Sequence, residues 1–188
     1  MFSLRAATYA DMPAICGFSR DPMELFRFFP QAQFPLTPEQ LANASFRCRS
    51  DQTLLLWQDQ PVGYADLYDL QPGIVASIGH VVVDLACRGR GGGRFLVQGM
   101  MAIAQERHQA PAVRLSCFSD NTPALLLYHE LGFQPHAMEI RHNPQCLLPR
   151  HHFAGGSREL RQHSSGLPMV MLHLEHRFST APETATAP

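Results

Sequence analysis

Residues 81–94 read Val81-Val82-Val83-Asp84-Leu85-Ala86-Cys87-Arg88-Gly89-Arg90-Gly91-Gly92-Gly93-Arg94, a β-branched run that leads into a turn rich in glycine and arginine. A β-branched run favours a buried strand, and glycine lets backbone N–H groups approach a ligand because it has no Cβ. After the glycines, Leu96, Met100, Ile103 and Ala104 recur at helical spacings. The stretch therefore predicts a strand, a tight turn and the start of a helix.

The predicted helix start suits a phosphate or diphosphate, because helix N-termini carry unpaired N–H donors and a positive partial charge. Arg88, Arg90 and Arg94 add positive charge there. A Walker loop would need Gly-Lys-Ser/Thr where Arg94-Phe95 stands, and a dinucleotide fingerprint would need its third glycine at Arg94 or Leu96. Neither common nucleotide motif fits.

The pattern that does fit is Arg/Gln-x-x-Gly-x-Gly/Ala after a strand, here Arg88, Gly91 and Gly93. It resembles motif A of the GNAT superfamily of N-acetyltransferases. A second pattern resembles motif B of that superfamily, with Asn121, Ala124, Tyr128 and Gly132-Phe133 at the expected spacing. The resemblance covers about residues 3–178, with the specific motifs inside 80–133. Leu85 departs from it, since proline often stands there, and three successive glycines predict a more flexible loop.

The resemblance implies an α/β fold with a mixed, largely antiparallel central sheet flanked by helices. A chain of 188 residues is long enough for one substantial core, so one domain is expected. We expect it to span 1–178, with an irregular loop over 143–167 and a disordered tail over 179–188.

The periodicity of apolar residues and the turn signals predict the other elements. Helical segments are expected from Thr8, over 21–30, over 37–49, and from Asp120 or Asn121 to Gly132. Strands are expected at 4–6, 53–57, 62–70, 74–83, 112–118, 133–142 and 168–178.

The composition limits the partners. Hydrophobic residues make up 45% and charged residues 16%, which is typical of a globular chain. Fifteen basic and sixteen acidic residues nearly cancel, so no long-range field favours nucleic acid or an anionic membrane. No apolar run approaches the roughly 18 residues of a membrane span, and Arg5 and Asp11 interrupt any secretory signal. We expect a cytoplasmic monomer or homodimer without nucleic-acid or membrane partners.

No metal site is expected. The five cysteines lack the short paired spacing of zinc or redox motifs, and reduced thiols explain them most simply. Four histidines lie near or within the irregular loop without carboxylate or cysteine partners at ligand spacing, His142, His151, His152 and His163.

The resemblance implies acetyl-CoA as the co-substrate, with its diphosphate on the glycine turn and its pantetheine arm paired to the central strand. It also implies that strands 74–83 and 113–118 splay apart there. The expected coenzyme-binding residues are Val81, Val82, Val83, Arg88, Gly89, Arg90, Gly91, Gly92, Gly93, Arg94, Asn121 and Tyr128. Asn121 is also expected to cap the motif B helix.

The resemblance further implies direct transfer to an amine without a cysteine nucleophile. Tyr128 stands where motif B places a general acid for the coenzyme sulfur, and simple packing beside the pantetheine is the alternative. The backbone N–H of Val83 is the candidate that holds the oxyanion. The resemblance also places four phenylalanines over the acceptor site, namely Phe26, Phe28, Phe29 and Phe34. The alternative interpretation is that they pack in the core.

The general base is the open question. Some members carry an acid or histidine at positions that are Ser77, Gly79 and Ser116 in this chain. The nearest titratable side chain is His80, of a residue type that titrates in a useful range, although strand alternation places it on the opposite face from Gly79. The alternatives are a water relay or a side chain of the neighbouring strand, Tyr64, Asp66 or Tyr68.

The sequence thus predicts an acetyl-CoA-dependent N-acetyltransferase that modifies a primary amine of a small molecule or peptide. The acceptor stays open among a small amine, an amino acid, a protein N-terminus and a lysine. Two other hypotheses stay beside it: a non-catalytic acyl-CoA-binding or sensing module, and a nucleotide-binding regulatory protein.

Overall fold

The computed structural model describes residues 1–144 and 166–179. Its strands are β1 (Phe2–Ala6), β2 (Ser50–Trp57), β3 (Gln60–Gln71), β4 (Val75–Val83), β5 (Ala112–Phe118), β6 (Gln134–Asn143) and β7 (Leu167–Arg177). Its α-helices are α1 (Met12–Cys16), α2 (Pro22–Phe28), α3 (Pro38–Leu41), α4 (Gly92–Ala102) and α5 (Thr122–Glu130). Short helical turns stand beside them at η1 (Tyr9–Asp11), η2 (Ala42–Phe46), η3 (Leu85–Cys87) and η4 (Ile103–Arg107).

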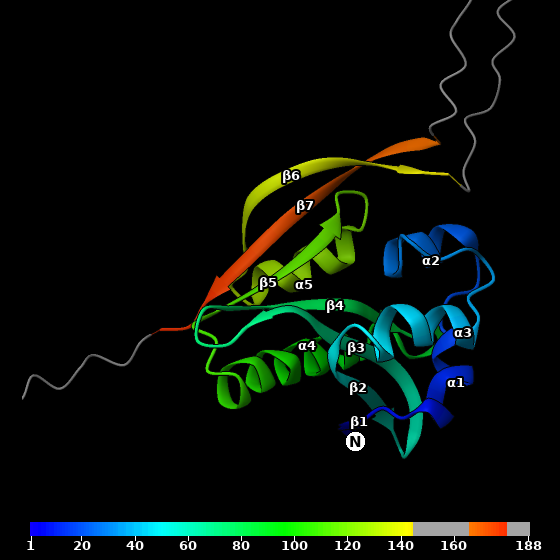
Figure 1. Ribbon diagram of the computed structural model, residues 1–188, viewed down its shortest axis with the longest axis horizontal. Helices are drawn as coiled ribbons and strands as arrows, with labels where there is room; N and C mark the ends of the chain where they lie inside the picture. The colour runs from blue at the N-terminus through cyan, green and yellow to red at the C-terminus, as the bar shows by residue number, and fades with distance from the viewer. Residues whose placement is uncertain (145–165, 180–188) are drawn as a thin grey trace, which may run out of the picture.

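The strands of the described residues form one sheet of seven in the order β1-β2-β3-β4-β5-β7-β6. Every neighbouring pair is antiparallel except β4 and β5, which are parallel. The predicted fold class, a largely antiparallel sheet flanked by helices, is confirmed (Figure 1).

Helices cover both faces of the first half of the sheet. On one face, α4 buries Leu96, Val97 and Met100 against side chains of β3, β4 and β5. On the other face, α1, α2 and α3 pack Ile15, Leu25 and other apolar residues against β2 and β3. Burial of this apolar surface fixes β4 in the middle of the molecule.

The parallel pair β4 and β5 separates part of the way along its length. Ala76, Ser77 and Ile78 pair with residues of β5, and the pairing stops at Ile78 opposite Leu115. Figure 1 shows β5, β6 and β7 leaning away from β4, with α2 beside the opening. The splay implied by the resemblance is therefore present.

A third apolar cluster joins α2 to the far side of the opening. Phe26 stacks on Phe118 of β5, with ring centroids 5.1 Å apart, and Met169 and Met171 of β7 complete the cluster. The start of α2 is fixed by Asp21, whose carboxylate accepts the N–H groups of residues 23 and 24 at 2.8 Å. The helix is thus held across the splayed strands.

The structure corrects the bounds of one predicted helix and of the predicted irregular loop. The helix predicted over 37–49 is shorter, since α3 passes into η2 and ends at Phe46, which leaves Arg49 to turn back toward the sheet. The irregular loop was expected over 143–167, but Asn143 ends β6 and Leu167 begins β7. Residues 145–165 and 180–188 lie outside the described part.

No helix in the described part of the chain has the length and apolar character needed to cross a membrane.

Candidate active site

The turn between β4 and α4 presents backbone N–H groups to open space. Gly91, the N-cap of α4, has a φ of 83°, and Gly89 has a φ of 73°, in the left-handed region that favours glycine. A Cβ built on either residue would meet no protein atom within 4 Å. The first N–H groups of α4 have no intrahelical partner and carry the positive end of the helix dipole. The turn therefore fits the diphosphate of a coenzyme.

Gly92 has a different role. A Cβ on Gly92 would approach Leu55 to 3.0 Å and Phe2 to 3.1 Å, closer than ordinary contacts. Glycine at this position lets the start of α4 lie against the sheet, and Gly92 faces the core instead of the turn's open side.

The arginines of the turn hold it in place. The Arg88 Nε donates to the Val83 carbonyl at 2.8 Å, and its Nη1 forms an ion pair with Glu24 of α2 at 2.9 Å. Arg94 pairs with Glu130 of α5. Arg88 and Arg94 thereby tie the turn to both neighbouring helices.

The end of β4 has a backbone edge that β5 does not pair with, and on it the Val83 carbonyl already accepts from Arg88 Nε at 2.8 Å. The Asp84 N–H donates to the Val62 carbonyl on β3 at 2.8 Å. Because backbone groups alternate in direction along a strand, the N–H and C=O of Val83 and Val81 point away from β3, toward the splay. Beyond Ile78, β4 has no pairing with β5. A peptide-like arm could therefore pair with this edge.

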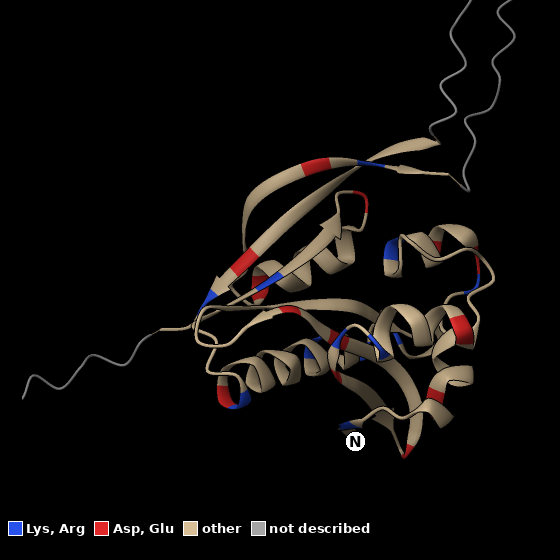
Figure 2. Cartoon of the chain, in the orientation of Figure 1, with Lys and Arg blue, Asp and Glu red and all other residues tan. Residues whose placement is uncertain are grey.

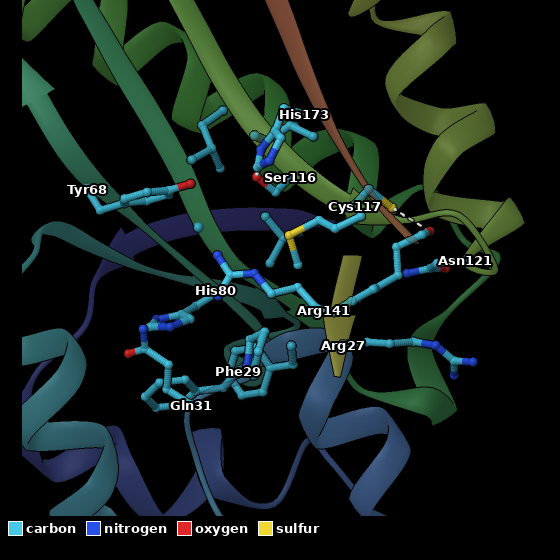
Figure 3. A pocket seen from close by; sticks show the side chains of 18 of the residues that line it. Arg27, Phe29, Gln31, Tyr68, His80, Ser116, Cys117, Asn121, Arg141 and His173 are labelled. Carbon is cyan, nitrogen blue, oxygen red and sulfur yellow. Dashed lines mark hydrogen bonds between the residues drawn. The ribbon is translucent and has the colours of Figure 1, made fainter. Parts of the chain in front are cut away.

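Two cavities meet at this edge. One, the glycine-turn cavity, has a volume of about 420 Å³ and is lined by Val81–Val83, residues of the turn and α5. The other, the His80 cavity, has a volume of about 380 Å³ and is lined by α2, the end of β4, β5, and residues of β6 and β7 (Figure 3). Five residues line both cavities, namely Arg27, Phe28, Val81, Asn121 and Tyr128.

His80 sits at a β-bulge. Tyr64 pairs with Val82 but Asp66 pairs with Gly79, so β4 has one more residue than β3 here. His80 has a φ of 49°, a backbone conformation that non-glycine residues rarely adopt and that clusters at functional sites. Bulges re-aim side chains, and this one turns His80 toward β3.

Asp66 holds the redirected imidazole. The His80 Nδ1 lies 2.7 Å from Asp66 Oδ2 in a fully buried contact, and the rings of Phe28 and Phe29 pack against the imidazole. Nε2 has no hydrogen-bond partner among the described residues, and His80 lines the cavity named after it. This is the arrangement of an oriented base, with one nitrogen fixed and the other available.

The bulge corrects one expectation. Simple alternation places His80 and Gly79 on opposite faces, yet both lie beside the same carboxylate. A Cβ on Gly79 would come within 3.0 Å of Asp66 Oδ1, while His80 bonds to Oδ2. Asp66, considered as an alternative base, is instead the partner of His80.

Three further groups surround the Asp66 carboxylate. The Arg49 Nη1 donates to Oδ1 at 3.0 Å, the Tyr64 hydroxyl lies 3.2 Å from Oδ2, and Ser45 Oγ donates to Oδ2. Burial alone would raise the pKa of Asp66, but the charges of His80 and Arg49 with the hydrogen bonds from His80 and Ser45 outweigh it and lower that pKa. Asp66 is therefore a buried carboxylate that stays ionised.

His173 is a second histidine in the His80 cavity, but both of its nitrogens are occupied. Its Nδ1 lies 2.8 Å from Ser116 Oγ, and its Nε2 lies 3.4 Å from Glu139 Oε1. Between the two histidines, His80 is the one with a nitrogen left for a substrate.

Tyr128 and Cys117 line the His80 cavity in protonated form. Burial raises the pKa of the Tyr128 phenol well above its usual value, and the nearby Cys117 adds to the shift. Burial also raises the pKa of the Cys117 thiol to about 12, with a further contribution from Asp120. Tyr128 therefore carries its proton at neutral pH, which a general acid must do, whereas Cys117 is a poor nucleophile.

Most of the predicted coenzyme residues gather in one place. The glycine-turn cavity is lined by Val81, Val82, Val83, Arg88, Gly89, Gly91, Gly93, Arg94, Asn121 and Tyr128. Arg90 is exposed and lies outside the lining, as does Gly92. Asn121 is the N-cap residue of α5, but its side chain makes no capping bond, so the expected capping by its side chain is not seen.

The four phenylalanines separate into three groups. Phe28 and Phe29 line the His80 cavity, Phe26 belongs to the apolar cluster with Phe118, and Phe34 is 38% exposed. Phe28 and Phe29 therefore lie where the resemblance places the acceptor site, whereas Phe26 packs in the core.

Sequence reasoning missed Arg49, Arg141 and His173, which line the His80 cavity. These residues come from a turn and two late strands that no local motif connects. The sequence does point to Asp66, which it offers as an alternative base, because a carboxylate within a buried apolar strand needs charged or hydrogen-bonding partners.

A sequence profile described as the acetyltransferase (GNAT) family matches residues 20–133. Comparison with curated protein sequences finds no significant match.

Solved structures share the fold at low sequence identity. The ribosomal-protein-S18-alanine N-acetyltransferase from Escherichia coli superposes with a TM-score of 0.66 at 18% identity, covering 100% of both chains. Spermidine N-acetyltransferase from Vibrio cholerae, in complex with CoA and spermine, gives 0.69 at 15% identity over 94% of this chain and 95% of that one. A GCN5-related N-acetyltransferase from Kribbella flavida gives 0.65 at 25% identity, over 94% and 98%.

Proposed function

The chain belongs to the GNAT acetyltransferase family, and we propose that it transfers an acetyl group from acetyl-CoA directly to a primary amine of a small molecule or peptide. The observation that carries the proposal is the meeting of two cavities at Val81 and Tyr128. One cavity has the features of a coenzyme site, and the other contains an oriented histidine.

The residues of the glycine turn would hold acetyl-CoA. The N–H groups from Gly89 to Arg94 suit its diphosphate, and the Val83 N–H and the Val81 carbonyl on the edge of β4 suit its pantetheine arm. The bound coenzyme supplies a thioester, whose carbonyl carbon accepts the nucleophile. The complex of the Vibrio cholerae neighbour with CoA supports this assignment.

In the proposed reaction the amine nitrogen bonds to the acetyl carbon while the carbon–sulfur bond breaks. The amine therefore loses one proton and the departing sulfur gains one. His80 Nε2 takes the amine proton, directly or through one water, while Asp66 keeps the imidazole oriented and stabilises its positive charge. Tyr128, kept neutral by burial, gives its proton to the sulfur.

A backbone N–H of β4 would stabilise the oxyanion. Val83 is the residue predicted from the resemblance, and it lines only the glycine-turn cavity. Val81 points to the same edge and lines both cavities. We therefore assign the oxyanion contact to Val81 and a pantetheine contact to Val83.

A direct mechanism is favoured over an acetylated enzyme. The thiol in the His80 cavity is Cys117, and its raised pKa of about 12 leaves little thiolate at neutral pH. Both substrates would then bind before any bond forms.

A thiol-release screen tests the proposal. Purified protein with acetyl-CoA is offered small amines, amino acids, lysine-containing peptides and peptides with free N-termini, and the release of coenzyme A is followed. Amine-dependent release supports the enzyme. Tight binding of acetyl-CoA in calorimetry without release by any amine would favour the non-catalytic binding module, and competition of ATP for the site would favour a nucleotide-binding protein.

A further inference from the structure

Three arginines line the His80 cavity. Its lining includes Arg27, Arg49 and Arg141 together with two histidines, and none of its described lining residues is Asp or Glu. Figure 2 shows basic segments on α2 and β6, the elements that carry Arg27 and Arg141. Figure 3 shows Arg141 extending from β6 into the same space that His80, Tyr68 and His173 line. The bias therefore comes from three separate parts of the chain.

Carboxylates outside the lining hold these arginines in position. Arg27 Nη2 pairs with Asp120 at 2.5 Å, and Arg141 Nε pairs with Glu139 at 2.8 Å. Each contact uses one nitrogen of a guanidinium group that has five N–H donors. Within the described part of the chain, the other nitrogens of Arg141 have no hydrogen-bond partner. Preorganised donors thus remain for a ligand.

Arg49 is the most enclosed of the three. Its side chain is 20% exposed, its guanidinium lies 4.4 Å from the centroid of the Tyr68 ring, and Nη1 donates to Asp66. A Cβ on Gly79 would lie 2.2 Å from the same nitrogen. Glycine at position 79 therefore makes room for the guanidinium, which Tyr68 and Asp66 hold in place.

The fixed guanidinium lies close to the proposed base. Arg49 and His80 bond to different oxygens of the same carboxylate, at 3.0 and 2.7 Å. A substrate anion that accepts from the remaining N–H groups of Arg49 would lie only a few bonds from an amine at His80. Arg141 lies on β6, on the other side of the cavity, and can donate to the second oxygen of a substrate carboxylate.

We infer that the acceptor is a primary amine that carries a carboxylate a few bonds from the nitrogen, as in an α-amino acid, and that Arg49 and Arg141 bind this carboxylate. The inference rests on the proposed function and deepens it. A polyamine is disfavoured, because further ammonium groups would face three arginines without a lining carboxylate.

The test uses amine pairs that differ by the carboxylate: L-phenylalanine with phenethylamine, L-methionine with its decarboxylated amine, and L-leucine with isoamylamine. Spermidine serves as the polycation, and β-alanine and γ-aminobutyrate vary the spacing. The value of kcat/KM is measured with the wild-type protein, Arg141→Gln and the control Arg177→Gln. Arg177 is an exposed arginine of β7 that pairs with Glu175 and lies outside both cavities.

We expect the wild type to prefer the acid of at least one pair by about 10-fold or more, the value of a lost charge-assisted contact. Arg141→Gln should reduce that preference to about twofold by slowing the acid alone, and Arg177→Gln should preserve it. The basicity of the amine differs between the two members of a pair but is the same for every protein variant. A change in the ratio of the two kcat/KM values between variants therefore reports the effect of the arginine. A loss of the ratio with intact turnover of the neutral amine also shows that the variant is folded.

A calorimetric titration separates this inference from the proposed function. The protein saturated with coenzyme A is titrated with each acid and its neutral partner. Selective binding of the acid, lost in Arg141→Gln, supports the inference even if no amine is acetylated. Equal or better use of neutral amines or spermidine would overturn the inference and leave the acetyltransferase intact, and absence of any acid preference in both turnover and binding would overturn it as well.

Discussion

Replacing His80 by asparagine tests the proposed base with little disturbance of the backbone. His80 has a φ of 49°, and asparagine is among the few residues that adopt this region readily. Asparagine tolerates this backbone region better than alanine because its short polar side chain can form local hydrogen bonds. Asparagine keeps a polar group beside Asp66 and removes only the proton acceptor, so a change in rate can be assigned to the imidazole.

The contacts of Asp66 set the expected loss of stability. A buried charge left without any partner costs about 3–5 kcal/mol. Here Arg49, Ser45 and Tyr64 still surround the carboxylate, at 3.0 Å in the case of Arg49. We therefore expect a decrease in the free energy of unfolding of about 1–3 kcal/mol, the value of one buried hydrogen bond.

The rate should fall much more than the stability. Loss of a positioned general base lowers kcat by about 10²- to 10⁴-fold, while acetyl-CoA still binds the glycine turn. The assay is a pH–rate profile with an acceptor whose amine titrates outside the window, together with urea unfolding of both proteins. The wild-type profile should rise through an acidic limb that the variant lacks. A variant that keeps this limb and most of its activity would refute the assignment of His80.

Three further predictions concern other groups. Tyr128→Phe should lower kcat by about 10²-fold, because a positioned acid is lost, and should leave the calorimetric affinity for acetyl-CoA nearly unchanged; equal losses of both would argue for packing alone. Cys117→Ala should retain activity, and the wild-type protein mixed with acetyl-CoA should show no acetylated Cys117 in mass spectra, because a thiol with a pKa of about 12 is ionised in only about one molecule in 10⁵ at neutral pH; an inactive variant or an acetylated Cys117 would argue for a covalent route. The hydrogen bond from Arg5 lowers the pKa of Asp11 in the folded state, so its contribution to stability is present above the ordinary carboxyl pKa of about 4 and lost as the pH falls below it. Asp11→Asn should therefore make the loss of stability between neutral and acidic pH shallower in urea unfolding, and an unchanged pH dependence would contradict the stabilising ion pair.

The coenzyme side of the site could be predicted from local sequence. A β-branched strand, a glycine turn and a helix follow one another directly, so one stretch of chain encodes their geometry. The left-handed φ of Gly89 and Gly91 follows from that stretch, and the edge of β4 that β5 leaves unpaired beyond Ile78 follows from the splay.

The acceptor side could not be predicted in the same way. Its walls come from α2, β4, β6 and β7, which are distant in sequence and meet only in the folded sheet. The bulge at His80 inserts one residue into β4 and reverses the face that alternation predicts. Arg49 reaches the site because the helix before it ends early, a boundary that propensity does not determine.

Binding of acetyl-CoA to matched glycine variants tests the central claim most directly. Gly91 and Gly73 have φ values of 83° and 73°, and a Cβ on either would meet no protein atom within 4 Å. Only Gly91 lines the glycine-turn cavity. Alanine should therefore cost each position about the same stability, roughly 1–2 kcal/mol.

In an isothermal titration with acetyl-CoA, the wild-type protein and Gly73→Ala should bind one equivalent with the same affinity, and Gly91→Ala should bind more weakly. Absence of binding to the wild-type protein, or equal affinity of all three proteins, would contradict the assignment of the glycine turn as the site of the coenzyme diphosphate.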